Sequence, residues 1–160
     1  MPTFTVTAQN RAWIPSAPVV LTDSFTLHAT PQLVFARLAD ISSWSDWYGG
    51  MKKVRIDGAS SGPGALRTVW VGSTRVQERF LEWVPGERLT FAIVASNTPG
   101  LASMVEDWAV EPDSSDPERT RLTVTVGVAA AGLLKRAPGL VRTIMKSSTK
   151  GASGIVSQFP

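Results

Sequence analysis

The stretch HATPQLVFARLADISSWSDW, residues 28–47, contains the clearest helix signal in the chain. Thr30 offers a hydroxyl to the free amides of a first helical turn, and proline follows it at the position where no N–H is needed. The glycine pair at 49–50 then provides a stop. Apolar residues between these limits recur at spacings of three and four, which predicts one helical face: Val34, Leu38, Ile41, Trp44 and Tyr48. We expect two short helices, with a break near residues 40–43.

Segments with strand periodicity flank this stretch on both sides. Before it, residues 19–27 alternate apolar and polar side chains, apart from Asp23, as a strand with one buried face does. After it, short turn sequences separate six further apolar segments. Their ranges are 51–57, 65–71, 74–84, 87–95, 101–111 and 119–128. Because strands joined by short turns pair as antiparallel neighbours, the sequence predicts one antiparallel sheet of about seven strands.

The end of the chain changes from strand to helix periodicity. Residue 138 opens a segment whose apolar residues form a single stripe as far as Phe159, with Gly151 and Gly154 as weak points. A sheet with one apolar face needs a cover, and this helix is long and apolar enough to supply it. We therefore expect an α+β fold in which the sheet curves round a long C-terminal helix. Small residues on the inner stripe, such as Ser148, leave room for a cavity.

The division of the chain follows from the same pattern. Residues 1–18 show no clear period and contain three prolines, so we expect an extended arm that adds at most a short strand. Residues 19–160 are expected to form a single domain, as is usual for a chain of this length.

The order of elements, together with HATPQLVFARLADISSWSDW, VPGERLTF, EDWAV and TRLTVTVGV, resembles the START/birch-pollen-allergen-like (SRPBCC) superfamily. The resemblance covers roughly residues 19–159. It is strongest to the bacterial polyketide cyclase/dehydrase branch, in which a helix start is followed by Asp, an apolar residue and Trp, as in Asp40, Ile41 and Trp44. It implies a helix-grip fold with an apolar cavity between the sheet and the C-terminal helix. The superfamily includes lipid and hormone carriers, aromatase/cyclase domains, hydrolases and assembly factors, and fold alone does not choose among them.

The composition excludes several kinds of site. The chain of 160 residues has no cysteine, which excludes disulfides, thiolate metal ligands and cysteine nucleophiles. His28 is the only histidine, and strand parity places it on the outward face. We therefore expect no Ser/His/Asp triad, no metal site and no cofactor. The N-terminal residues lack the basic start and apolar run of a signal peptide, and no apolar run is long enough to span a bilayer, so we expect a cytoplasmic protein.

Glu106 is the candidate catalytic residue. It shares a strand face with Met104 and Trp108, and this face is expected to point inward. A carboxyl group on the wall of an apolar cavity has a raised pKa and can act as an acid or a base. The alternative is that Glu106 forms an ion pair with an arginine such as Arg67 or Arg79.

Aromatic and helix residues complete the expected ligand site. Cavities that bind small molecules favour Trp and Phe walls, and six tryptophans are many for a chain of this length. Helical spacing places Trp44 in the core, whereas Trp47 lies about 60° from that stripe, near the expected entrance. The expected ligand-binding residues are Trp47, Trp70, Phe91, Glu106, Trp108, Ile144, Met145 and Ser148.

Three functions fit these features. The first is binding of an apolar or aromatic small molecule, such as a lipid or a polyketide, in the cavity. The second is catalysis of the cyclase/dehydratase type, in which a cavity carboxylate moves a proton. The third is an interaction or a peripheral membrane contact through the basic face of Arg142, Lys146 and Lys150. From residue 132 onward the chain has five basic residues and no acidic one. No aromatic platform accompanies them, so nucleic-acid binding is not expected.

Overall fold

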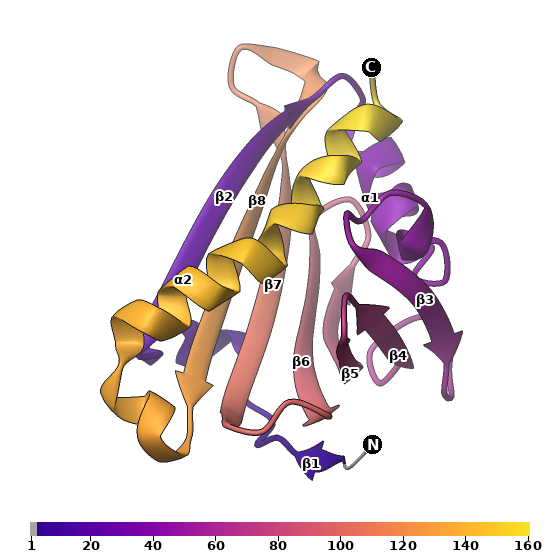
Figure 1. The fold of residues 1–160 in the computed structure, drawn as a ribbon. Coiled ribbons are helices and arrows are strands. Elements are labelled where there is room, and N and C mark those ends of the chain that lie inside the picture. The colour runs from indigo at the N-terminus through magenta and orange to yellow at the C-terminus, as the bar shows by residue number, and fades with distance from the viewer. Residues whose placement is uncertain (1–2) are drawn as a thin grey trace.

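The computed structural model describes residues 3–160, apart from the side chain of Ser148, and its main feature is a curved antiparallel sheet (Figure 1). Its strands follow one another in the order β2-β8-β7-β6-β5-β4-β3. Their bounds are Val19–Leu27 (β2), Met51–Ile56 (β3), Leu66–Val71 (β4), Thr74–Val84 (β5), Arg88–Ser96 (β6), Leu101–Asp113 (β7) and Asp116–Ala130 (β8). From β3 to β8 each strand pairs with the next one along the chain, because short turns connect them. The predicted α+β helix-grip fold is confirmed.

Two short helical segments connect β2 to β3, as the sequence predicts. The α-helix α1 spans Pro31–Ala39, and the 3-10 helix η2 spans Trp44–Asp46. Thr30 occupies the position before α1, but its side chain makes no capping hydrogen bond. The indole nitrogen of Trp44 donates a hydrogen bond to the carbonyl oxygen of Leu38 over 2.9 Å, and this bond ties η2 to the end of α1.

The C-terminal helical segment lies across the concave face of the sheet (Figure 1), but it is not one continuous α-helix. The α-helix α2 spans Pro138–Thr149, and the chain continues as the 3-10 helix η4 over Lys150–Gln158. A further short 3-10 helix, η3 over Gly132–Arg136, links β8 to α2. Among the described residues, no helix combines the length and the apolar character that crossing a membrane requires.

The change from α2 to η4 occurs where the helix touches the loop that follows η2. The carbonyl oxygen of Gly151 accepts a hydrogen bond from the amide of Gly49 over 3.0 Å. A Cβ atom on Gly154 would lie 1.8 Å from the carbonyl oxygen of Trp47, a distance that no side chain can occupy. Gly151 and Gly154 therefore allow the backbone of the helical segment to contact the backbone of residues 47–49. The sequence predicts only that these glycines weaken the helix.

The N-terminal arm bridges two strands of the sheet that separate from each other. The ladder between β6 and β7 ends at the pair Ala92 and Val105. Beyond that pair, β1 (Phe4–Thr5) forms a short antiparallel ladder with the end of β6. The next residues reach β7, where the amide of Thr7 donates a hydrogen bond to the carbonyl oxygen of Ala102 over 2.9 Å. The arm thus supplies backbone partners to both strands.

A second part of the arm covers the outer face of the sheet. The 3-10 helix η1 spans Arg11–Ser16, and its Ile14 side chain is buried against Ala92 and Val105 on the convex side. Ala92 and Val105 are themselves fully buried. This small apolar cluster shields the middle of the sheet from solvent on the side opposite α2.

Substitution of Gly154 by alanine tests the contact between η4 and the loop. We expect Gly154→Ala to lower the free energy of unfolding by about 1–3 kcal/mol, because the new methyl group forces two backbones apart. Gly139→Ala is the matched control: a Cβ there meets nothing within 4 Å, and the change should be neutral or stabilising by about 0.5–1 kcal/mol. Urea-induced unfolding followed by circular dichroism measures both values. Equal stabilities of the two variants would contradict the close contact.

Candidate functional site

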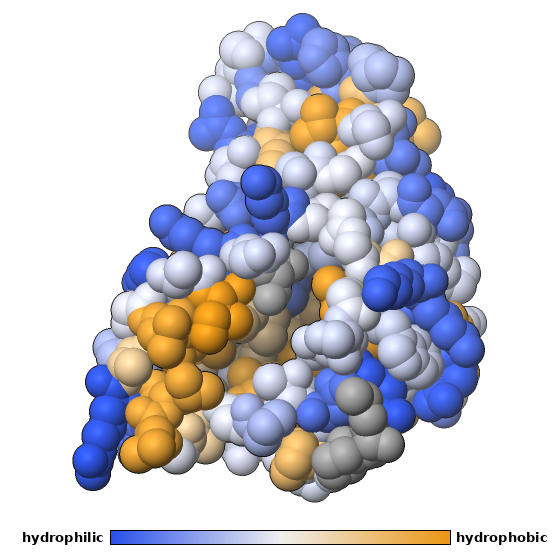
Figure 2. Space-filling model, in the orientation of Figure 1, coloured by the Kyte–Doolittle hydropathy of each residue, from blue (hydrophilic) through white to orange (hydrophobic). Residues whose placement is uncertain are grey.

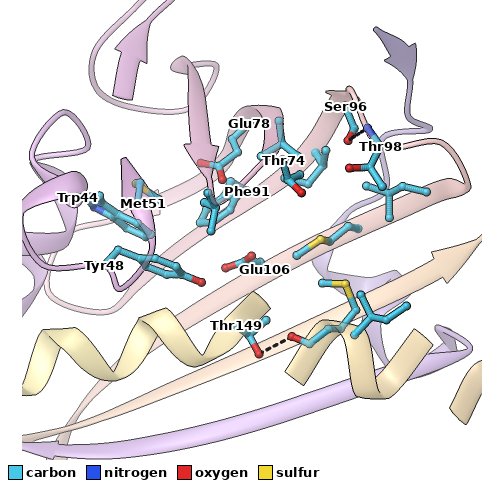
Figure 3. A pocket seen from close by; sticks show the side chains of 17 residues that line it. Trp44, Tyr48, Met51, Thr74, Glu78, Phe91, Ser96, Thr98, Glu106 and Thr149 are labelled. Atoms are coloured by element: carbon cyan, nitrogen blue, oxygen red, sulfur yellow. Dashed lines mark hydrogen bonds between the residues drawn. The ribbon is translucent and has the colours of Figure 1, made fainter. Parts of the chain in front are cut away.

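A cavity of about 160 Å³ lies between the concave face of the sheet and α2 (Figure 3). The buried side chains of Tyr48, Glu78 and Glu106 come together at its inner end, whereas Thr98 at the other end is exposed to solvent. The wall between the two ends is mainly apolar and includes Met51, Val71, Phe91, Ile93, Met104 and Met145. The cavity is therefore an apolar space with a small polar group of residues at its closed end.

Strand β7 places Glu106 on the wall of this cavity. Met104, Glu106 and Trp108 alternate along the strand, so all three side chains point to the concave face, and all three are buried. Met104 and Glu106 line the cavity, whereas Trp108 lies behind it, with its ring centre 4.8 Å from that of Trp44. The indole nitrogen of Trp108 donates a hydrogen bond to the Glu106 carboxyl group over 3.1 Å.

The Glu106 carboxyl group keeps its proton to unusually high pH. Burial raises its pKa, the nearby carboxyl group of Glu78 adds to the effect, and the resulting pKa of Glu106 is about 7. A group with this pKa is present in both forms at neutral pH, so it can donate or accept a proton. The hydroxyl group of Tyr48 points toward it across the closed end of the cavity (Figure 3). Within residues 3–160, no group of three His, Asp or Glu side chains is arranged to hold a metal ion.

Arg67 forms an ion pair with Glu78 behind the closed end of the cavity. Both side chains are buried, and the Nε atom of Arg67 lies 2.5 Å from a carboxylate oxygen of Glu78. Its Nη1 atom donates a hydrogen bond to the carbonyl oxygen of Ile41 over 2.8 Å, and its guanidinium carbon lies 4.0 Å from the ring centre of Trp44. Burial raises the pKa of Glu78, and the charge of Arg67 opposes this shift. The expected alternative, an ion pair between Glu106 and Arg67, is not the arrangement found.

Trp44 lies in the core as expected, whereas Trp47 does not lie at the rim of the cavity. Trp44 belongs to the core and also lines the cavity. Trp47 packs behind it, with ring centres 4.9 Å apart, and is only 5% exposed. The expectation assumed the 100° per residue of an α-helix, whereas η2 is a 3-10 helix, in which each residue turns by about 120°.

Two of the predicted helix residues reach the cavity from α2. Ile144 and Met145 line it opposite Phe91, which reaches it from β6. The side chain of Ser148 lies outside the described part of the structure.

Trp70 lies away from the cavity. Its neighbour Val71 lines the cavity, so strand alternation points Trp70 to the convex side of β4. There the ammonium group of Lys53 lies 5.1 Å and the guanidinium group of Arg55 lies 5.7 Å from its ring centre. These distances are those of cation–π contacts at a protein surface.

Sequence reasoning missed three residues of the closed end: Tyr48, Arg67 and Glu78. For Glu78 a signal is present, since it stands between Val76 and Phe80 on one face of β5, where an acidic residue is unexpected. A β-bulge after Phe80 hides this signal. It shifts the alternation by one residue, so that apolar residues stand at both odd and even positions of the strand sequence.

The raised pKa of Glu106 predicts a dependence of stability on pH. Between its ordinary value of 4.5 and about 7, the unfolded chain loses the Glu106 proton while the folded protein retains it, so stability falls as pH rises through this window. Glu106→Gln has no titrating carboxyl group at this position, so its stability should not fall in this window. The variant should gain about 3 kcal/mol of unfolding free energy relative to the original protein between about pH 4 and about pH 8. Urea titrations across this range measure the gain, with the exposed Glu87→Gln as control. A constant difference between Glu106→Gln and the original protein would contradict the assigned pKa.

Comparisons with known proteins agree with this architecture. The family model for polyketide cyclases/dehydrases and lipid transport proteins matches residues 18–156. An uncharacterised protein of Mycobacterium tuberculosis is 28% identical over 132 residues, which cover 81% of this chain and 77% of the relative. The crystal structure of Zhui aromatase/cyclase from Streptomyces has a TM-score of 0.71 at 17% identity, covering 88% of this chain and 92% of that one. A START superfamily protein from Mycobacterium smegmatis has a TM-score of 0.67 at 13% identity, covering 87% of this chain and 97% of that one. The chain belongs to the polyketide cyclase/dehydrase and lipid transport family.

Proposed function

We propose that this protein binds a small apolar or aromatic molecule in the cavity between its sheet and α2. The observation that supports this function is the contrast between the apolar wall and the buried acidic group at the closed end. Burial of apolar ligand surface would supply most of the binding free energy, at about 25 cal/mol per Å². A hydrogen bond to the protonated carboxyl group of Glu106 would orient a ligand that carries an oxygen atom at one end.

The volume of the cavity limits the size of the ligand that it can enclose. A cavity of about 150 Å³ in another protein holds a benzene molecule, and the volume here is about 160 Å³. A ligand with one or two rings is thus the appropriate probe. A larger lipid or polyketide would extend through the open end past Thr98 and α2.

A cavity-filling substitution tests the binding function. The probe is 1-naphthol, with binding followed by tryptophan fluorescence, because Trp44 lines the cavity. Ile93→Trp places a large side chain in the cavity and should weaken 1-naphthol binding at least tenfold, since the ligand and the new ring compete for one volume. Ile56→Trp introduces the same change on β3 outside the cavity and should leave affinity unchanged.

One result of this experiment would contradict the proposed binding site. Equal affinity of 1-naphthol for Ile93→Trp and Ile56→Trp would place binding elsewhere and contradict the proposal. Native mass spectrometry of the purified original protein adds an independent readout, since a molecule that co-purifies should be absent from Ile93→Trp.

A second candidate function is catalysis of a cyclisation or dehydration. The observation that favours it is the pKa of about 7 at Glu106, which suits a general acid or base at neutral pH. In a dehydration, the carboxylate would remove a proton from the carbon beside a ketone. The hydroxyl group on the next carbon would then leave as water, with a proton returned by the same carboxyl group. The Zhui aromatase/cyclase has the same fold, and this likeness makes the reaction class worth testing.

Glu106→Gln separates catalysis from binding. With an aromatic β-hydroxyketone as substrate, loss of water creates a conjugated double bond that absorbance detects. The substitution should lower kcat by about 100-fold or more, the usual contribution of a general acid or base. The affinity for 1-naphthol should remain within about threefold, because the amide keeps the shape of the carboxyl group and its hydrogen-bonding capacity. A kcat that survives in Glu106→Gln would remove Glu106 from the mechanism, and the exposed Glu87→Gln serves as control.

A further inference from the structure

Three apolar side chains lie exposed where β8 continues into η3 and α2. Leu133 on η3 is 86% exposed, and Leu140 and Ile144 on α2 are 52% and 49% exposed. Leu140 and Ile144 are four residues apart, so they stand on one face of the helix. Figure 2 shows a continuous apolar patch over this region of the molecule. We call these three residues the leucine patch.

The leucine patch adjoins the cavity. Ile144 belongs both to the patch and to the cavity wall, and Leu134, the neighbour of Leu133, packs at the edge of the core near Gly100. Figure 2 shows the hollow of the molecule directly beside the apolar patch. An apolar surface therefore runs from the outside of α2 into the cavity without a polar barrier at Ile144.

Basic residues border the leucine patch. Lys135 and Arg136 follow Leu133 on η3, are exposed, and form no ion pair within residues 3–160. The segment from residue 132 to the end contains five basic residues and no acidic one, while the rest of the chain has an acidic excess. Exposed apolar side chains next to uncompensated basic ones are the combination that binds anionic membrane surfaces.

We propose that the protein docks on an anionic lipid bilayer through the leucine patch, with Lys135 and Arg136 contacting the lipid headgroups. In this orientation the open end of the cavity faces the bilayer, so an apolar molecule could pass between membrane and cavity without crossing water. The contact is peripheral, since none of the described helices can span the membrane. This docking does not depend on the identity of the ligand.

A second copy of this chain fits the leucine patch less well. In a two-fold symmetric dimer the same surface meets itself, so the basic residues Lys135 and Arg136 of both copies would lie at one interface. The segment that carries the patch offers no carboxylate to neutralise them. An anionic lipid surface removes this repulsion and also covers the leucine side chains.

Vesicle flotation tests the docking. The full chain is mixed with vesicles of equal parts phosphatidylcholine and phosphatidylserine, and separately with vesicles of phosphatidylcholine alone. We expect the protein to float with the anionic vesicles and to be released by high salt. Leu133→Ser should weaken this binding at least about tenfold through lost apolar burial. Arg136→Glu should weaken it at least about fivefold, because each basic residue near an anionic surface contributes about that factor.

Matched controls keep the test specific. Leu33→Ser changes a leucine that is 60% exposed on α1, and Arg119→Glu changes an arginine near the start of β8, the end of that strand far from η3. Both variants should float like the original protein. Failure of the original protein to bind anionic vesicles, or equal binding by Leu133→Ser and Leu33→Ser, would overturn the proposal. So would a dimer in analytical ultracentrifugation that Leu133→Ser dissociates, because a second copy would then cover the patch. Loss of 1-naphthol binding in Ile93→Trp tests the cavity separately from all of these results.

Discussion

The buried guanidinium group of Arg67 is the constraint on which the closed end of the cavity depends. A charge removed from water must keep its partners, because losing one leaves an unpaired buried charge at a cost of several kcal/mol. The partners of Arg67 are the Glu78 carboxylate, the Ile41 carbonyl oxygen and the face of Trp44. These partners come from β5, from the segment between α1 and η2, and from η2 itself. One side chain on β4 therefore holds the helical segment against the sheet and fixes the position of Trp44.

The same constraint sets the chemistry of Glu106. Arg67 neutralises one buried carboxylate, Glu78, and a second carboxyl group stands nearby without a positive partner of its own among the described residues. A second buried negative charge is costly, so a proton remains on Glu106 until the pH approaches neutrality. The cavity thus has a closed end that holds a proton and an apolar wall that α2 completes. A ligand that enters past Thr98 meets the titratable group last.

The sequence predicts the order of elements and the inward face of β7 because both follow from simple periodicity. Met104, Glu106, Trp108 and Val110 alternate regularly with the residues between them, so this pattern places Glu106 on the inward face. Three other features follow from local departures from ideal geometry, which periodicity does not detect. A bulge after Phe80 conceals Glu78, the 3-10 turn at Trp44 buries Trp47 beside it, and the α-helix gives way to a 3-10 helix where the backbone of Gly151 meets that of Gly49. Trp70 shows the same limit, since an aromatic residue on a strand packs equally well under basic side chains at the surface.

The separation of β6 from β7 has a consequence for how such a cavity can exist at all. Beyond Ala92 and Val105 the two strands no longer pair with each other, and Thr98, which follows β6, lies at the open end of the cavity. The separation leaves backbone N–H and C=O groups of β6 and β7 without partners from each other. The arm supplies partners through β1 and Thr7. The arm lies between the two strands and is held there by backbone hydrogen bonds to both of them. The open end of the cavity and the backbone pairing of residues 4–7 thus lie at the same interrupted end of the β6–β7 ladder.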